Sequence, residues 1–300
     1  MNALWMLVAA LLFSLMGACI KVASRQYGIA ELVFYRSLFG VATLYAYVQW
    51  RGLRLTTPVA AMHLKRSVSG VAALALWFYA TSLLPLGTAM TLNYTSPLFL
   101  AALVIGVALR AKHEVDWKLA GTVVIGFIGV VFVLQPSFSQ DEGGVALAGL
   151  LSGVLSAAAY WSVRQLGLTG EPEWRTVFYF SLAGTVLGLA GSLWSGFSAH
   201  DARGLWLLVA IGTTATLAQL AMTRAYSRGH TLGTANLQYS AVIFATVLGI
   251  MMFGDRIETS GWIGIAIIIA SGVASTALTA LKRPAQRAAE TTDVEPTAEK

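Results

Sequence analysis

Charged side chains are scarce in this sequence. Only 11% of its 300 residues are Asp, Glu, Lys or Arg, whereas a soluble protein carries about a quarter. The chain is 57% hydrophobic, with apolar stretches about as long as a bilayer is thick. This composition excludes an ordinary soluble domain and predicts an all-α polytopic membrane protein. A β-barrel is excluded because segments so long and so continuously apolar do not alternate as barrel strands must.

Cysteine is almost absent. The single Cys19 lies inside the first apolar stretch, so no disulfide can form within one chain, and no Cys/His metal set exists. We expect Cys19 to serve packing, and we expect no cofactor and no metal. The sequence also has no nucleophile–base set and no HExxH motif. A membrane enzyme is therefore disfavoured.

Acidic residues are missing from the middle of the apolar stretches. All 14 Asp and Glu residues fall in predicted loops, at segment ends or in the tail, and so do the four histidines. No carboxylate is thus placed to relay a proton across a membrane. This predicts a facilitator, an exchanger, or coupling through the charged cluster at the outer ends of the first two segments.

The apolar stretches predict ten transmembrane helices, each near the roughly 20 residues that cross a bilayer. Their predicted ranges are 3–23, 32–50, 67–84, 88–109, 117–135, 145–166, 176–196, 205–226, 234–254 and 260–281. The first range is too long for the apolar part of a signal peptide and lacks a basic start, so we expect it to remain as a helix. Residues 283–300, rich in Ala, Glu, Thr and Pro, predict a disordered cytoplasmic tail.

Basic residues orient these helices through the positive-inside rule. With a cytoplasmic N-terminus, fourteen basic residues fall inside and four outside. The inside set is Arg51, Arg54, Lys65, Arg66, Arg110, Lys112, Lys118, Arg164, Arg175, Arg224, Arg228, Lys282, Arg283 and Arg287. The outside set is Lys21, Arg25, Arg203 and Arg256. Both termini are therefore predicted to be cytoplasmic. Topology also explains the net charge of +6 without nucleic acid, because no segment carries a clustered Lys/Arg face.

The two halves of the chain repeat one another. Residues Val33 to Gly40 match Val177 to Gly184 at six of eight positions, with an offset of 144. Further matches pair Tyr94 with Tyr239, and Gly121 and Gly129 with Gly264 and Gly272. Five helices per half is an odd number, so the second copy must enter the membrane inverted. The halves are predicted to be residues 1–140 and 141–282, an architecture typical of secondary transporters.

These residues resemble the drug/metabolite transporter superfamily, specifically its EamA-type ten-helix permeases. The resemblance rests on Val33-Phe34-Tyr35-Arg36, on Asn93 to Phe99 with its proline, and on charged turns before two Gly-x7-Gly helices. It covers about residues 1–282 and implies a small-metabolite permease of the bacterial inner membrane, most members exporting. Its relatives carry amino acids, drugs, vitamins such as riboflavin, or opine metallophores, so the cargo stays open. Lys112 stands where the family usually has Glu, and we carry over no role for that turn.

Polar and aromatic residues at membrane depth are the candidate substrate contacts, because such groups usually face a cavity or a partner. The candidates are Asn93, Tyr94, Ser96, Gln238, Tyr239, Gln219, Trp77, Tyr79, Tyr160, Trp161, Lys21 and Arg36. Helix–helix hydrogen bonding is the alternative for the amides, and packing for the aromatics. Arg36 either pairs with Glu31 or a helix end, or presents its charge to a substrate carboxylate. Phe180 replaces Arg36 in the second repeat.

The sequence therefore predicts a secondary transporter, monomeric or homodimeric, that exports an amino acid or related carboxylate across the lipid bilayer by alternating access. The alternatives are a vitamin, opine metallophore or multidrug carrier, in which the aromatics matter more than the charges. A receptor would leave the duplication unexplained. A channel is disfavoured because no ring of like charges or filter sequence appears.

Overall fold

A computed structural model describes residues 2–83, 86–135, 143–254 and 258–292, and over these ranges every regular element is a helix. A short 3-10 helix, η1 (Asn2–Leu4), leads into the first α-helix. The helices are α1 (Trp5–Ala23), α2 (Ile29–Trp50), α3 (Ala60–Leu83), α4 (Leu86–Asn93), α5 (Ser96–Arg110), α6 (Trp117–Leu134), α7 (Gly143–Leu168), α8 (Glu173–Ser195), α9 (Ala202–Arg228), α10 (Thr231–Leu237), α11 (Ser240–Phe253) and α12 (Thr259–Thr292). The all-helical prediction is confirmed for the described residues.

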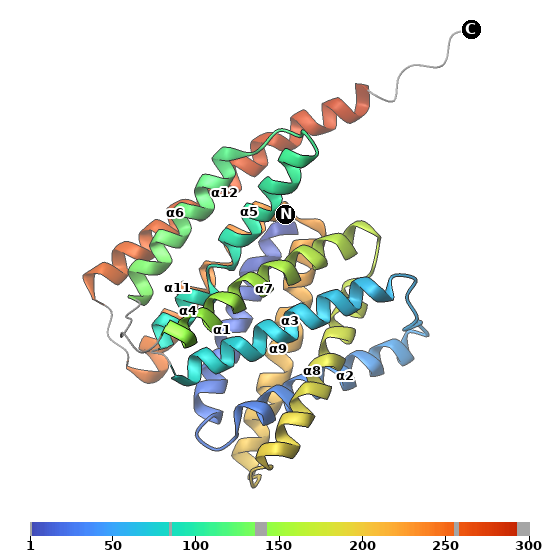
Figure 1. Ribbon diagram of the computed structural model, residues 1–300, viewed down its shortest axis with the longest axis vertical. Coiled ribbons are helices and arrows are strands. Elements are labelled where there is room, and N and C mark those ends of the chain that lie inside the picture. Colours follow the sequence, from blue (N-terminus) through green and yellow to red (C-terminus); the bar gives the residue numbers. More distant parts are fainter. Residues whose placement is uncertain (1, 84–85, 136–142, 255–257, 293–300) are drawn as a thin grey trace.

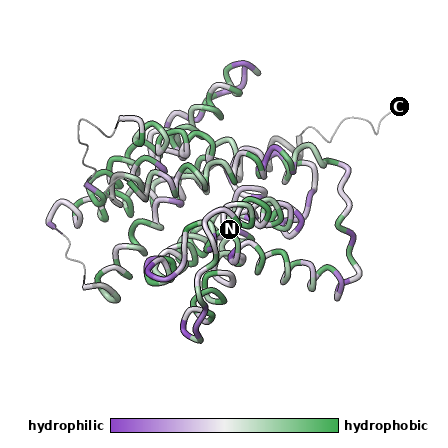
Figure 2. Tube along the Cα trace, turned by 60° about the horizontal axis from the view of Figure 1, so that its bottom comes forward, coloured by the Kyte–Doolittle hydropathy of each residue, from purple (hydrophilic) through white to green (hydrophobic). Residues whose placement is uncertain are grey.

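The helices form one bundle (Figure 1). In the tube of Figure 2, green, hydrophobic stretches along the helices are separated by purple, hydrophilic residues near their ends. Nine of the described helical segments are long and apolar enough to cross a membrane. The segment outside that set is α3, whose first two turns hold His63, Lys65 and Arg66. The chain is therefore a multi-pass membrane protein.

The predicted fourth and ninth helices are each present as one segment long enough to cross a membrane, but each is interrupted along its length. The fourth is divided into α4 and α5 at Tyr94-Thr95, and the ninth into α10 and α11 at Gln238-Tyr239. Pro97 in the first turn of α5 has no N–H to donate, which explains the first break. The second break has no proline; Tyr239 N instead bonds the carbonyl oxygen of Asn236, a tighter turn than an α-helix makes. Both breaks fall on residues that the repeat equates.

Two further boundaries differ from prediction. α3 starts at Ala60 rather than near residue 67, so His63 lies in a helix and not in a loop, and Arg66 lies one turn further in. Thr57 accounts for this start, because its hydroxyl accepts a hydrogen bond from Val59 N at 3.1 Å. α12 continues to Thr292, so residues 283–292 are helical where a disordered tail was expected. Pro85, Asp255 and Arg256 lie outside the described residues.

Four helix pairs make the most extensive contacts: α1 with α9, α2 with α8, α3 with α7, and α6 with α12. Figure 1 shows the last pair side by side along one flank of the bundle. Small residues permit the α2–α8 approach. A Cβ on Gly40 would lie 2.7 Å from Ser181 Oγ, and one on Gly184 would lie 2.6 Å from Ser37 Oγ. These two contacts are reciprocal, since Ser37 matches Ser181 and Gly40 matches Gly184 in the repeat.

Candidate functional site

A cavity of about 760 Å³ lies within the bundle, walled by residues of both halves of the chain. This is the size of a small-molecule site. At one end the wall includes the exposed residues Lys21, Ser24 and Ile29, where α1 ends and α2 begins. The cavity is therefore open at that end of the bundle. Under the predicted orientation this is the outer end.

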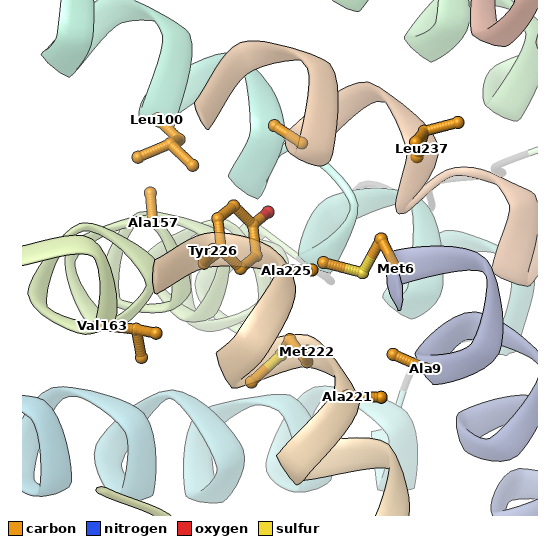
Figure 3. Packing of buried hydrophobic residues seen from close by; sticks show 11 residues of the cluster. Met6, Ala9, Leu100, Ala157, Val163, Ala221, Met222, Ala225, Tyr226 and Leu237 are labelled. Carbon is orange, nitrogen blue, oxygen red and sulfur yellow. The ribbon is translucent and has the colours of Figure 1, made fainter. Parts of the chain in front are cut away.

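Packed apolar side chains close the cavity on the side of the N-terminus. Met6 and Met222 line it, and both belong to a buried cluster that also includes Ala9, Ala225 and Tyr226 (Figure 3). These residues come from α1 and α9, which pack along each other. The methionine side chains thus form a water-excluding floor.

Two arginines near this floor make polar and aromatic contacts but do not line the cavity. The Arg164 Nη1 group donates to the carbonyl oxygen of Ser227 at 2.7 Å. The guanidinium of Arg224 lies over the Trp5 ring, 5.1 Å from its centroid. Neither arginine lines the cavity.

The two breaks place their polar residues on the cavity wall. Asn93 and Tyr94 line it from the first break, and Gln238 lines it from the second. The Asn93 amide donates to Ser152 Oγ at 3.1 Å. This hydrogen bond to α7 fixes the orientation of the amide.

The Gln238 amide forms hydrogen bonds with the hydroxyl groups of two tyrosines. Tyr226 donates its hydroxyl to Gln238 Oε1 at 2.9 Å, and Gln238 Nε2 donates to the Tyr160 hydroxyl at 3.4 Å. The two tyrosine rings stack in parallel with centroids 4.9 Å apart. Tyr160 lines the cavity and Tyr226 does not. Tyr226 is thus a buried support that orients the exposed face of the Gln238–Tyr160 pair.

Three cations line the cavity: Lys21, Arg36 and Arg66. No Asp or Glu is found in the part of its wall that the structure describes. Arg36 and Arg66 are buried, 6% and 3% exposed. Among the described residues, Arg36 Nε and both Nε and Nη1 of Arg66 have no hydrogen-bond partner. A buried charge without a partner is costly, so this wall is electrostatically prepared for an anion.

Arg36 does not pair with Glu31, the partner that the sequence offered. Glu31 instead accepts a hydrogen bond from Ser198 N at 3.2 Å and lies 3.6 Å from His200 Nε2. It thereby ties the start of α2 to the loop before α9. Beside Arg36 a void of about 10 Å³, also lined by Gln219, has room for a single water.

Arg66 is the functional candidate that sequence reasoning missed. It was assigned to an inside loop because the third helix was expected to begin after it. Its guanidinium carbon instead lies 4.4 Å from the centroid of the Phe180 ring. Gly70, one turn further along α3, leaves the space that the guanidinium fills, and a Cβ there would overlap Arg66 Nη1.

Of the twelve residues predicted to contact substrate, eight line the cavity: Lys21, Arg36, Trp77, Asn93, Tyr94, Tyr160, Gln219 and Gln238. The other four lie elsewhere. Ser96 and Tyr239 are fully buried behind the wall, and Trp161 packs on the floor cluster. Tyr79 is 51% exposed on the outer surface of the bundle.

A polar cluster joins two loops at the opposite end of α2 and α8. Glu171 accepts hydrogen bonds from Thr57 Oγ1 at 2.7 Å and from Arg175 Nη1 at 3.0 Å, and its carboxylate lies 3.3 Å from His63 Nε2. Burial raises the pKa of this carboxyl, but the hydrogen bonds from Thr57, Arg175 and His63 outweigh it and hold the pKa below its ordinary value. The cluster pins the loop before α3 to the loop before α8.

Broken helices facing one cavity inside a membrane bundle are typical of transporters. The EamA-like transporter family model matches residues 1–135 and 144–276, and the chain belongs to this family. Its sequence is 31% identical over 270 residues to the pseudopaline exporter CntI of Pseudomonas aeruginosa, covering 88% of this chain and 92% of that one. It is 28% identical to a riboflavin transporter of Vibrio cholerae, covering 90% of this chain and 91% of that one.

A crystal structure shares the fold with a TM-score of 0.78 and 19% identity, over 93% of this chain and 98% of the other. The names of the family and of these relatives are those of transporters, not enzymes. The protein is therefore a membrane transporter of a small molecule. The family predicted from the sequence is confirmed.

Proposed function

We propose that this protein is an inner-membrane permease that exports a small anionic metabolite, an amino acid or related carboxylate, by alternating access. One observation carries the proposal: a cavity at the two helix breaks holds three cationic side chains and no acid in its described wall. A carboxylate entering the cavity would offset the free-energy cost of burying the guanidiniums, and it would accept hydrogen bonds from their free N–H groups.

Alternating access rests on ten membrane helices arranged as two inverted repeats, residues 1–140 and 141–282, with both termini in the cytoplasm. The reciprocal Gly40–Ser181 and Gly184–Ser37 contacts support this arrangement, because residues related by a two-fold axis contact each other in both directions. The two segments matched by the family model support the same division. The helix breaks at Tyr94 and Tyr239, equivalent residues, support a shared binding level.

A vitamin, opine metallophore or multidrug carrier is the second candidate. The riboflavin and pseudopaline names of the relatives favour it, and so do the ring systems of Phe13, Trp77 and Tyr94 on the cavity wall. In that case aromatic stacking would supply most of the affinity, and the cations would contribute little.

A metabolite survey of cells with and without the protein, followed by uptake and efflux of each changed compound in proteoliposomes, tests the proposal. The double variant Lys21→Gln and Arg36→Gln separates the two candidates. Loss of transport for anionic or zwitterionic cargo supports the first, and unchanged transport supports the second. If no solute moves in either direction across a broad panel, the transport proposal fails.

A further inference from the structure

We propose that Arg36 and Arg66 form a paired-guanidinium site that selects substrates with two separate carboxylates. This inference rests on the proposed function and deepens it, since it names the class of anion. The sequence showed only one guanidinium at this level of the bundle. The structure brings a second to the same cavity from another helix.

The position of the second guanidinium follows from the repeat. Phe180 on α8 is the equivalent of Arg36 on α2, so the second repeat lacks the charge that the first one has. Arg66 on α3 lies over the Phe180 ring at 4.4 Å. Arg66 thereby places a cation next to Phe180, the position at which the second repeat has no arginine. Both arginines line the same cavity, Arg36 from α2 and Arg66 from α3, the latter over an aromatic ring of α8.

The packing around Arg66 holds it ready for a ligand. The Phe180 ring covers the guanidinium on one side, and the buried Nε and Nη1 atoms have no hydrogen-bond partner among the described residues. The missing side chain at Gly70 gives the group its space. A planar guanidinium held in this way keeps unsatisfied N–H donors, which a carboxylate can accept.

The burial of both arginines argues against a merely structural role. Arg36 is 6% exposed and Arg66 is 3% exposed, and each retains at least one N–H without a partner among the described residues. A surface cation would be hydrated, and a structural buried cation would be paired. Two guanidiniums that line one cavity, each with an unsatisfied N–H group, are best compensated by two anionic groups, and one monocarboxylate leaves one of them uncompensated.

The test uses the full chain in vesicles of zwitterionic phosphatidylcholine. The probes are glutarate and adipate, each against the monocarboxylate of equal chain length, valerate and hexanoate. In the wild-type protein we expect each dicarboxylate to bind at least about tenfold more tightly than its partner, the order of effect of one charge-assisted hydrogen bond. Arg66→Gln should abolish this preference and leave valerate and hexanoate binding intact.

Lys65→Gln is the matched control, because it removes a cation from the neighbouring, exposed position of α3, outside the cavity wall. It should retain the preference. Phe180→Leu, which keeps both arginines, should reduce the preference without abolishing monocarboxylate binding. Retained monocarboxylate binding also shows that each variant is folded.

Equal binding of dicarboxylates and monocarboxylates by the wild-type protein would overturn the paired site and leave the transport proposal standing. Inorganic phosphate carries its charge on one group, so phosphate binding as tight as that of adipate would also overturn it. A loss of adipate affinity on adding phosphatidylglycerol that is tenfold larger for the wild type than for Arg66→Gln, which experiences the same surface potential, would assign the arginines to a lipid headgroup instead. If none of the probes binds and no other solute is transported, the proposed function itself fails.

Discussion

The guanidinium of Arg66 lies 4.4 Å above the ring of Phe180, the residue that replaces Arg36 in the second half of the chain. The two repeats differ at this position, and Arg66 contacts the residue that breaks the match. The charge that the second repeat lacks comes from a helix of the first.

Gly70→Ala tests whether the position of Arg66 matters, not only its charge. The added Cβ would overlap Arg66 Nη1 and also lie 3.0 Å from the Phe180 ring, so the guanidinium must move off its aromatic support. We expect the dicarboxylate preference to fall about tenfold with the net charge unchanged. Gly106→Ala, where nothing lies within 4 Å of the new Cβ, is the control and should behave as wild type. An unchanged preference in Gly70→Ala would contradict the assignment.

The sequence predicted the helical class and the family, because long apolar runs and a 144-residue repeat can be recognised without knowing how the helices pack. Eight of the twelve residues that it proposed as substrate contacts lie on the cavity wall. It missed Arg66 because a cation beside an apolar run is usually a topological signal. Thr57-Pro58 was the available clue, since such a pair often begins a helix and would have placed Arg66 inside α3.

The four candidates away from the wall show a different limit. Tyr94 and Tyr239 are equivalent in the repeat, yet Tyr94 lines the cavity and Tyr239 is fully buried between α6 and the breaks. Hydropathy and repeat matching give the depth of a residue in a helix. They do not give its rotation, which depends on how each helix packs on its neighbours.

Tyr226→Phe should weaken substrate binding although Tyr226 does not line the cavity. Its hydroxyl is the donor that orients Gln238 Oε1, at 2.9 Å. Loss of this hydrogen bond should weaken binding by about 1 kcal/mol, which corresponds to a roughly fivefold rise in KM. Proteoliposome uptake should show this rise with the maximal rate unchanged. Tyr45→Phe, at a 49% exposed position, is the control. A fall in maximal rate at constant KM would argue for a role in helix movement instead.

The α2–α8 crossing predicts an order of stability among glycine variants. A Cβ on Gly188 would lie 2.5 Å from the backbone nitrogen of Phe34, and backbone cannot move aside. We expect Gly188→Ala to destabilise the protein by about 1–3 kcal/mol. Gly184→Ala should cost less, because the Ser37 hydroxyl it meets can rotate away. Thermal unfolding in detergent measures the order, and the reverse order would contradict this packing of α2 on α8.

Glu171 predicts a pH-dependent contribution to stability. His63, Arg175 and Thr57 surround this carboxylate, and the pKa of Glu171 is held below its ordinary value. A depressed pKa means that the carboxylate stabilises the fold above the ordinary value and that this stabilisation is lost as pH falls through the lower, folded value. Glu171→Gln should thus cost about 1–3 kcal/mol at neutral pH, because Arg175 and His63 lose their charged partner.

The difference in melting temperature between wild type and Glu171→Gln should shrink as pH falls from neutral to roughly pH 3. Glu258→Gln gives a control carboxylate that is exposed at the start of α12. A difference that is constant with pH would show that the glutamine change acts through packing and not through charge.

The orientation of the bundle can be read with single cysteines, because Cys19 is the only native one. In a Cys19→Ala background, Arg51→Cys lies at the exposed end of α2 and Arg203→Cys in the exposed first turn of α9. The positive-inside rule places the first in the cytoplasm and the second outside. A membrane-impermeant maleimide added to intact cells should therefore label Arg203→Cys at once, and Arg51→Cys only after the membrane is permeabilised.

Labelling of both positions from outside would contradict the odd number of crossings between them, and with it the inverted repeat. The opposite pattern would keep the repeat and reverse the orientation, so that the open end of the cavity would face the cytoplasm.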